Sequence, residues 1–267
     1  MENISLISKL LDLIYPDALY CISCGKLIDR SRTYNLCNEC MREMKWAVGR
    51  TCDKCGKPIS DNNPNETCYS CREHAHVFDK GFTVCEYGEH ERSIIFALKY
   101  SGRTDIAGRI AEMMHDRLAM LRREGKAPVY DLVVPVPIYG AKKRKRGFNQ
   151  AALIAKSLAE MEGARYEESL IMRIRDTRAM KGLSPIERRR NVSGAFEINR
   201  NLIPGRLQDL NILTVDDIYT TGATIDEIAS ILKQAGAAYV FAGSFAAGAD
   251  VIKSNNNEEN TAEEYEI

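Results

Sequence analysis

The periodicity of apolar residues changes at about residue 80 of this 267-residue chain. Beyond that point, short runs rich in valine, isoleucine and phenylalanine alternate with longer segments whose apolar residues recur every three or four positions. Strands alternating with helices indicate an α/β fold, with a mostly parallel sheet flanked by helices. The short runs predict strands at 82–87, 130–137, 168–175, 211–217 and 239–247. The longer segments predict helices at 90–102, 104–125, 148–163 and 224–237.

The first 78 residues lack this alternation and hold eight of the nine cysteines. Since domains usually run to roughly 100 to 200 residues, the length predicts one sizeable core and a small extra module. We expect a cysteine-rich module with an N-terminal helix at 1–78 and an α/β domain at 79–250. Segment 251–267 is polar and acidic with almost nothing to bury, so we expect it to be disordered.

The early cysteines form two copies of one pattern, C-x2-C-x12-C-x2-C, each with Gly-Lys directly after its first pair. Thiolates at this spacing predict closed tetrahedral sites, so we expect two structural Zn2+ ions in a double zinc ribbon. A disulfide scaffold is the weaker alternative, because no secretory signal precedes the cysteines. Pairing within each quartet is the simplest assignment, although a cross-braced pairing uses the same residues. The predicted ligands are Cys21, Cys24, Cys37, Cys40, Cys52, Cys55, Cys68 and Cys71.

Other residues near this module have simpler interpretations. His74 and His76 are expected to be exposed linker residues, since both quartets are already complete. Cys85 has apolar neighbours in a predicted strand and is expected in the core rather than as a reactive thiol. The only tryptophan, Trp46, gives thin support for a base-stacking surface on the module.

Composition excludes several classes of protein. The chain is 45% hydrophobic and 28% charged, which is typical of a globular protein rather than a disordered one. No stretch approaches the roughly 18 consecutive apolar residues that a membrane span needs, so we expect no membrane insertion and a cytoplasmic, unsecreted protein. The formal net charge is +0, so attraction to nucleic acid would have to come from local basic runs.

The predicted strand 211–217 ends in two adjacent carboxylates, and hydroxyl-bearing residues follow at once in "VDDIYTTGAT". Asp216 and Asp217 would repel each other there unless they accept hydrogen bonds from ligand hydroxyls or help to hold a cation. The next segment combines small residues, hydroxyls and the free N–H groups of a helix start, which together favour an anion. A pentose 5-phosphate would satisfy both halves. The segment consists of Thr220, Thr221, Gly222, Ala223 and Thr224.

An ordinary helix start is the competing interpretation of this segment. Thr224 and Glu227 fit a capping box, so part of the signal reports helix capping. The segment matches neither the P-loop pattern nor the G-x-G-x-x-G pattern of dinucleotide folds.

Two basic segments strengthen the case for a polyanionic ligand. Residues 134–151, "VPVPIYGAKKRKRGFNQA", follow a predicted buried strand, and residues 173–196 form a long predicted loop rich in arginine. Basic runs are usually solvated or contact nucleic acid. Beside an acidic pair and a phosphate loop, they suit a diphosphate, and the second segment could close over it as a lid.

The sequence "ILTVDDIYTTGAT" resembles the phosphoribosyl diphosphate signature of type I phosphoribosyltransferases. Together with the cysteine repeat, the RGFNQ, ER-x-x-NV-x-x-AF and LKYSG motifs resemble the ComF family of competence-associated, phosphoribosyltransferase-like proteins. The resemblance covers about residues 15–248. One departure is Met180, where family members commonly have glutamine.

The resemblance implies a type I phosphoribosyltransferase-like fold that binds 5-phosphoribosyl 1-diphosphate with Mg2+ and transfers phosphoribosyl to a nitrogen acceptor. It implies that Asp216 and Asp217 meet the ribose hydroxyls and that residues 220–224 hold the 5-phosphate. Further contacts are assigned to Arg146 and Gly147 for the diphosphate, and to Arg173 and Arg189 in the lid.

Two limits follow for this function. Glutamine-dependent amination needs a glutamine-hydrolysing domain, and the early cysteines are assigned to zinc, which argues against that activity. A non-enzymatic alternative is a DNA-uptake accessory protein whose ribbons and basic segments bind single-stranded DNA or a competence helicase or translocase.

Overall fold

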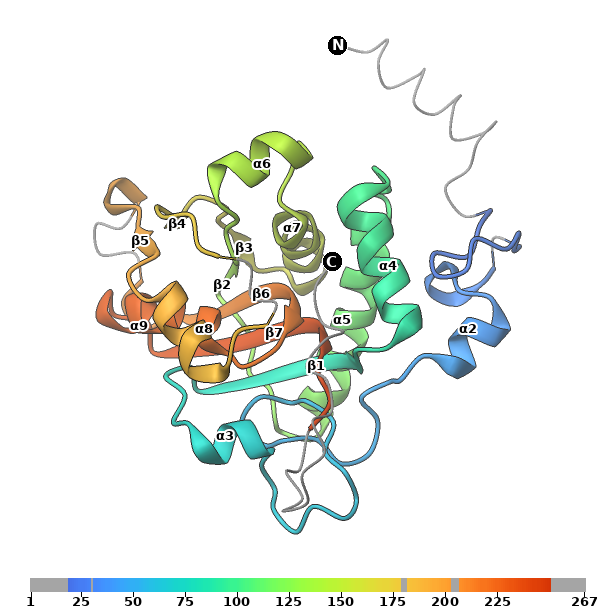
Figure 1. Ribbon diagram of the computed structural model, residues 1–267, viewed down its shortest axis with the longest axis horizontal. Coiled ribbons are helices and arrows are strands. Elements are labelled where there is room, and N and C mark those ends of the chain that lie inside the picture. The colour runs from blue at the N-terminus through green and yellow to red at the C-terminus, as the bar shows by residue number, and fades with distance from the viewer. Residues whose placement is uncertain (1–18, 30, 179–181, 203–206, 251–267) are drawn as a thin grey trace.

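The computed structural model describes residues 19–29, 31–178, 182–202 and 207–250 (Figure 1). The expected N-terminal helix, the expected acidic tail and Met180 lie outside these ranges. A five-stranded, entirely parallel sheet forms the centre, in the order β1-β7-β6-β2-β3. Its strands are β1 (Lys80–Glu86), β2 (Leu132–Pro135), β3 (Arg165–Tyr166), β6 (Asn211–Tyr219) and β7 (Tyr239–Ala247).

Helices cover both faces of the sheet. Because β6 and β7 lie between other strands and are covered on both faces, most of their residues are buried. One face carries α4 (Glu89–Tyr100), α5 (Ile106–Arg123) and α7 (Gln150–Glu162), and the other carries α9 (Ala223–Gln234). The prediction of a mostly parallel sheet flanked by helices is therefore confirmed.

The predicted strand at 168–175 is not part of this sheet. Within it, β4 (Ile171–Arg173) pairs antiparallel with β5 (Phe196–Ile198) in a separate two-stranded sheet. Ile171 is buried, but Met172 and Ile174 are 39% and 46% exposed, so the apolar run is covered on one side only. The short β3 takes the edge position beside β2 instead.

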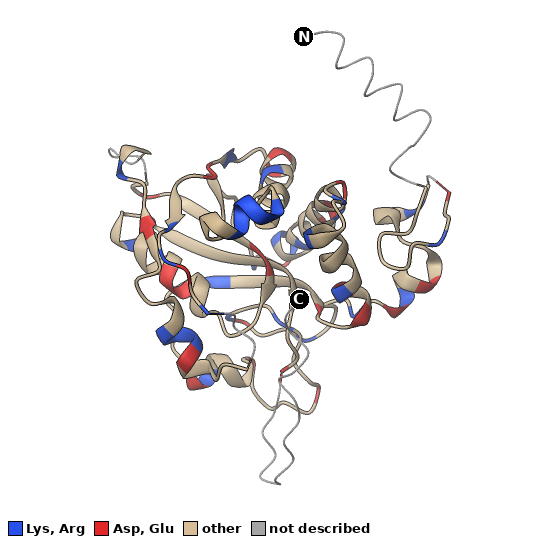
Figure 2. Ribbon diagram, turned by 45° about the horizontal axis from the view of Figure 1, so that its top comes forward, with Lys and Arg blue, Asp and Glu red and all other residues tan. Residues whose placement is uncertain are grey.

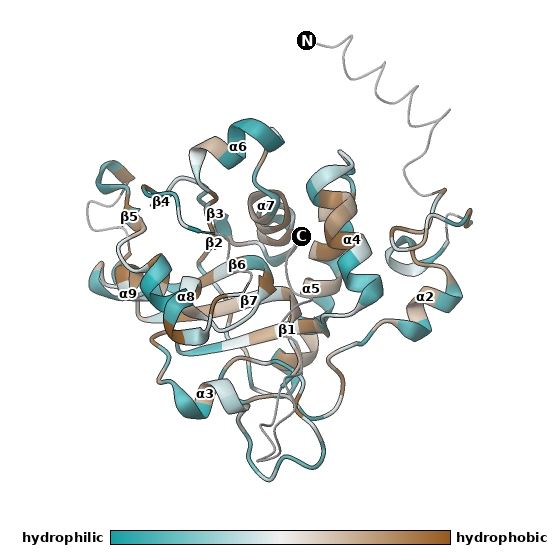
Figure 3. Cartoon of the chain, in the orientation of Figure 1, coloured by the Kyte–Doolittle hydropathy of each residue, from teal (hydrophilic) through white to brown (hydrophobic). Residues whose placement is uncertain are grey.

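Both basic segments contain helices that the apolar pattern did not predict. Helix α6 (Gly140–Arg146) has no buried residue, so no apolar period reveals it, and Figure 3 shows it as hydrophilic. It ends at Gly147, whose φ of 89° suits glycine. Helix α8 (Pro185–Val192) follows β4 and precedes β5 along the chain, and it begins with a capping box formed by Ser184 and Glu187.

The two cysteine repeats pack directly against the sheet domain. The first ribbon, residues 19–47, contains a 3-10 turn (Thr33–Asn35) and α2 (Asn38–Glu43), and it continues the sheet edge because Ala47 donates a backbone hydrogen bond to Val84 of β1 (2.7 Å). The second ribbon, residues 51–78, contains α3 (Tyr69–Glu73), and its Cys55 and Phe78 belong to the core under α9. In the described ranges, no helix has the length and apolar character needed to cross a membrane.

Candidate functional site

Each cysteine quartet forms one compact cluster, with all four sulfur atoms within 4.8 Å of one another. Four sulfurs bound at about 2.3 Å around a tetrahedral Zn2+ lie about 3.8 Å apart. The Sγ atoms of Cys24 and Cys37 are 3.8 Å apart, and those of Cys55 and Cys68 are 3.7 Å apart. These distances exclude disulfides and fit Zn2+. Pairing within each quartet is confirmed, and the cross-braced alternative is wrong.

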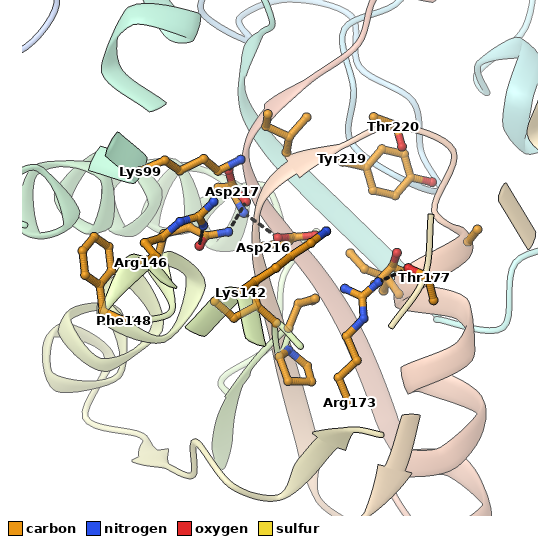
Figure 4. A pocket seen from close by; sticks show the side chains of 18 of the residues that line it. Lys99, Lys142, Arg146, Phe148, Arg173, Thr177, Asp216, Asp217, Tyr219 and Thr220 are labelled. Atoms are coloured by element: carbon orange, nitrogen blue, oxygen red, sulfur yellow. Dashed lines mark hydrogen bonds and ion pairs between the residues drawn. The ribbon is translucent and has the colours of Figure 1, made fainter. Parts of the chain in front are cut away.

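The main cleft, of about 760 Å3, opens at the carboxyl edge of the sheet. It forms because β2 ends at Pro135, opposite Val215, whereas β6 continues beside β7 to Tyr219. The last residues of β6 therefore face open space on the side where β2 has ended. Ligands of parallel α/β sheets bind at such a divergence of neighbouring chains. Asp216 and Asp217 lie on this free edge (Figure 4).

The two carboxylates have different surroundings. Asp217 is 4% exposed and pairs with Lys99 of α4 (Oδ2 to Nζ 2.6 Å), while Gln150 of α7 donates to its Oδ1 (3.2 Å). Burial opposes ionisation of Asp217, but Lys99 and Gln150 outweigh it, so its pKa lies below the usual value. Asp216 is partly buried. Its own burial and the charge of Asp217 raise its pKa well above the usual value. Hydroxyl donors or a cation at Asp216 would relieve this cost.

The RGFNQ motif builds the wall opposite the aspartates. Arg146, at the end of α6, donates to Gln150, which in turn donates to Asp217. Asn149 caps α7 and also donates to the carbonyl of Val136 (3.0 Å), which ties α7 to the loop after β2. The motif therefore joins the basic helix, the acidic pair and the β2 loop in one hydrogen-bonded unit (Figure 4).

Residues 220–224, the threonine loop, run from the end of β6 into the first turn of α9 and line the cleft. The predicted capping box of Thr224 and Glu227 is wrong. Helix α9 begins at Ala223, its N-cap is Gly222, and no side chain caps it. The Glu227 carboxylate instead accepts a hydrogen bond from the Gly194 amide (2.6 Å). The first N–H groups of this helix are thus not satisfied by a side-chain cap, and they suit an anion.

The third side of the cleft comes from the segment around β4. Arg173 lines the cleft, its guanidinium packs over Phe196, and its buried Nε has no hydrogen-bond partner among the described residues. Burial lowers the pKa of Arg173, which the charge of Asp216 opposes. Arg178 also lines the cleft, and Asn191 of α8 holds its backbone through two hydrogen bonds of 3.1 and 2.9 Å.

Nine of the eleven residues predicted to contact the ligand line this single cleft, and two do not. Gly147 terminates α6 outside it, and Arg189 lies 4.0 Å from Asp226 on the far side of the loop. Sequence reasoning missed Lys99 and Gln150 as partners of Asp217. Lys99 lies in the LKYSG motif and Gln150 in the RGFNQ motif, and membership of these motifs was the available signal for both residues. The nine predicted residues that line the cleft are Arg146, Arg173, Asp216, Asp217, Thr220, Thr221, Gly222, Ala223 and Thr224.

The charges of the cleft are arranged by sign. Basic side chains from α4, α6 and the β4 segment surround the acidic pair, and Figure 2 shows the concentration of basic residues on α6. Such a cleft suits a ligand that combines hydroxyls with more than one anionic group. Two further predictions about buried and exposed residues have opposite outcomes. Cys85 is fully buried, as predicted. His76 was predicted to be an exposed linker residue, and this is wrong, because its side chain is 0% exposed.

Comparison with known proteins agrees with the cysteine pattern and the motifs. A family model described as a double zinc ribbon domain matches residues 10–72. The DNA utilization protein YhgH of Salmonella typhi is 31% identical over 207 residues, covering 78% of this chain and 88% of that protein. Competence protein F of Haemophilus influenzae is 26% identical over 81% of this chain and 91% of its own, and Competence protein ComFC of Bacillus subtilis is 23% identical over 82% and 91%.

Solved structures also align in part. A glutamine phosphoribosylpyrophosphate amidotransferase from B. subtilis aligns with a TM-score of 0.35 and 20% identity, covering 56% of this chain and 30% of that one. An adenine phosphoribosyltransferase aligns with a TM-score of 0.33 and 15% identity, over 59% and 85%. The fold described above rests on the chain's own topology. With its double zinc ribbon and with 31% identity across most of a relative's length, the chain belongs to the ComF family.

Proposed function

We propose that the protein binds 5-phosphoribosyl 1-diphosphate with Mg2+ and transfers the phosphoribosyl group to a nitrogen acceptor. One observation carries the proposal: the acidic pair, the threonine loop and the cations of α6 and β4 line the same cleft. Together they offer a partner to each group of the ligand. The loop would take the 5-phosphate, Asp216 and Asp217 the ribose hydroxyls, and Arg146 and Arg173 the diphosphate. The four-thiolate zinc sites suit a reducing compartment, so we place the protein in the cytoplasm.

In the proposed reaction, the bond between ribose C1 and the diphosphate oxygen breaks, and a bond from C1 to the acceptor nitrogen forms. Negative charge accumulates on the departing diphosphate, which Lys142, Arg146 and Arg173 would stabilise. When bound, Mg2+ supplies further neutralisation of the diphosphate. Asp217 stays ionised through Lys99, so it can accept from a hydroxyl, while Asp216 becomes a better acceptor once a hydroxyl or cation offsets its desolvation.

Calorimetry with phosphoribosyl diphosphate and Mg2+ tests this function. We expect saturable heat with the wild-type protein and at least a tenfold loss of affinity after Asp216→Asn with Asp217→Asn, because hydrogen bonds to charged acceptors contribute roughly 1.5 to 3 kcal/mol each. Unchanged folding, followed by circular dichroism, is the control. A wild-type protein that releases no heat would refute the proposal.

A second candidate is binding of single-stranded DNA during DNA uptake. The names of the relatives include competence and DNA utilization, and a surface of suitable chemistry lies beside the cleft. On α6, four consecutive basic residues are exposed, and on α4 the exposed Phe96 and Tyr100 rings lie 5.1 Å apart. Arg146 packs over the Tyr100 ring at 5.3 Å. Basic tracks with exposed aromatic rings suit single strands. DNA binding that survives the double aspartate variant, without any heat from phosphoribosyl diphosphate, would favour this function.

A further inference from the structure

The second ribbon contacts the threonine loop through the chain segment that follows α3. His76 donates through Nδ1 to Oδ2 of Asp226 (2.7 Å), and the Val77 amide donates to Oδ1 of the same carboxylate (2.9 Å). Asp226 lies in the first turn of α9, and its own amide donates to the Gly222 carbonyl (2.8 Å). Both oxygens of this carboxylate are therefore engaged by two consecutive residues of the ribbon's exit segment.

The His76 ring also forms part of the floor of the loop. Its side chain is 0% exposed, it stacks on the buried Phe78 at 4.8 Å, and its Nε2 lies 3.5 Å from the Tyr219 hydroxyl. Phe78 in turn meets the Tyr219 ring edge-on at 6.2 Å. A buried ring with contacts on this many sides has little freedom to rotate.

The backbone of Gly222 rests on this floor. A Cβ atom at this position would lie 2.5 Å from the Tyr219 hydroxyl and 2.8 Å from Cε1 of His76. The loop is thus in contact with His76 at its central residue, and its left-handed φ of 78° is compatible with that close approach only because the residue is glycine. Movement of His76 would leave a gap directly beneath the loop.

We propose that His76 is a positioning residue that holds the threonine loop in the shape that receives a phosphate, so that the second ribbon supports the ligand cleft. The proposal rests on the proposed function for its ligand, but the support of the loop is a property of the free protein. The first ribbon offers a matched comparison. His90, in the first turn of α4, contacts the first ribbon through Ser23 (2.9 Å) and Glu43 (3.0 Å), at the end of α4 away from the cleft.

The test compares His76→Phe, His76→Asn and His90→Phe in the full-length, zinc-loaded protein. Phenylalanine keeps a ring but loses the hydrogen bond to Asp226, whereas asparagine keeps a donor in the position of Nδ1. Hydrogen exchange of residues 220–226 is measured without ligand, and calorimetry with Mg2+ measures affinity for ribose 5-phosphate and, separately, for inorganic diphosphate.

We expect His76→Phe to exchange faster at 220–226 and to bind ribose 5-phosphate about tenfold more weakly, the effect of one charge-assisted hydrogen bond, with unchanged affinity for diphosphate. His90→Phe should match the wild type, whereas His76→Asn, which keeps a donor for Asp226 but removes the ring beneath Gly222, should show a smaller change than His76→Phe. If His76→Phe does not fold, Asp226→Ala breaks the same link from α9 and should show the same selective change.

The proposal is overturned if residues 220–226 exchange at the wild-type rate in His76→Phe, whatever the affinities for the two ligands. The same criterion applies to Asp226→Ala if that variant has to replace His76→Phe. An equal loss of affinity for both ligands would also overturn it, because that result indicates general destabilisation. The two proposals fail separately: faster exchange in a protein whose wild type binds neither ligand would leave the support of the loop standing and remove the proposed function.

Discussion

Lys99 shows how one residue sets the charge state of the cleft. The Lys99 side chain is 11% exposed, and its ammonium lies 2.6 Å from the carboxylate of Asp217, whose side chain is 5% exposed, so each charge depends on the other. Apart from its place in the LKYSG motif, Lys99 resembles an ordinary basic residue in the last turn of an amphipathic helix. Its partner is 118 positions away, and only the packing of α4 beside β6 brings them together.

We expect Lys99→Met to destabilise the protein by about 3 kcal/mol near neutral pH, because it leaves a buried carboxylate without its cation. In the wild type, the pKa of Asp217 is lowered, so this group stabilises the fold above the unfolded pKa of about 3.9 and loses that contribution as the pH falls. The difference between variant and wild type should therefore shrink below about pH 4. Denaturant unfolding across pH measures this, and adding Asp217→Asn should restore most of the loss. An equal penalty at all pH values would contradict the ion pair.

At the scale of elements, α6 presents two faces with different roles. Lys142 and Lys145 line the cleft, whereas Lys143 pairs with Glu168 (2.7 Å) and Arg144 is exposed outside it. All four look alike in the sequence. The helix itself could not be predicted, because a helix without a buried residue has no apolar period.

Removing two positive charges from either face distinguishes a small ligand from a polymer. Lys142→Gln with Lys145→Gln should weaken phosphoribosyl diphosphate about tenfold at low salt, and Lys143→Gln with Arg144→Gln should leave its affinity unchanged. Binding to single-stranded DNA depends on the number of phosphate contacts, so the two pairs should affect it and its salt dependence about equally. Calorimetry and fluorescence anisotropy at two salt concentrations measure these effects. Equal effects on phosphoribosyl diphosphate would show that the cleft-facing lysines do not contact it.

Other elements were predicted to different extents. The central strands and long helices follow from their apolar patterns, because burial on one or both faces determines those patterns. The acidic pair and the threonine loop were identifiable because carboxylates, hydroxyl-bearing residues and a glycine occur in succession after a buried apolar run. The β4–β5 pair could not be predicted. A strand with Ile171 buried and Met172 exposed could belong to the central sheet or to a separate one, and its actual partner strand contains Phe196, 25 residues after Ile171.

At the scale of the whole molecule, the two zinc ribbons have the same sequence pattern and different surroundings. Lys26 and Lys57 follow equivalent Cys-Gly steps, yet Lys26 is exposed and pairs with Glu39, whereas Lys57 is 4% exposed and its ammonium lies over the Tyr219 ring at 6.0 Å. The first ribbon shares the core formed with α4 and α5 at the edge of the sheet, and the second shares the core beneath the cleft. A repeat in the sequence predicts two similar folds but cannot predict which copy is buried.

The glycines of these two steps give a direct measure of that difference. Gly25 and Gly56 have the same φ of 73°, but a Cβ on Gly25 would meet no atom of the described residues within 4 Å, whereas one on Gly56 would lie 2.4 Å from Cα of Phe82. Gly25→Ala should cost about 1 to 2 kcal/mol, the strain of a left-handed alanine. Gly56→Ala carries the same strain and also forces the second ribbon away from β1, so it should cost several kcal/mol more. Denaturant unfolding of the zinc-loaded proteins gives both values, and hydrogen exchange shows whether residues 220–226 loosen in Gly56→Ala alone. Equal costs for the two variants would mean that the second ribbon is attached as loosely as the first, and that the cleft does not depend on it.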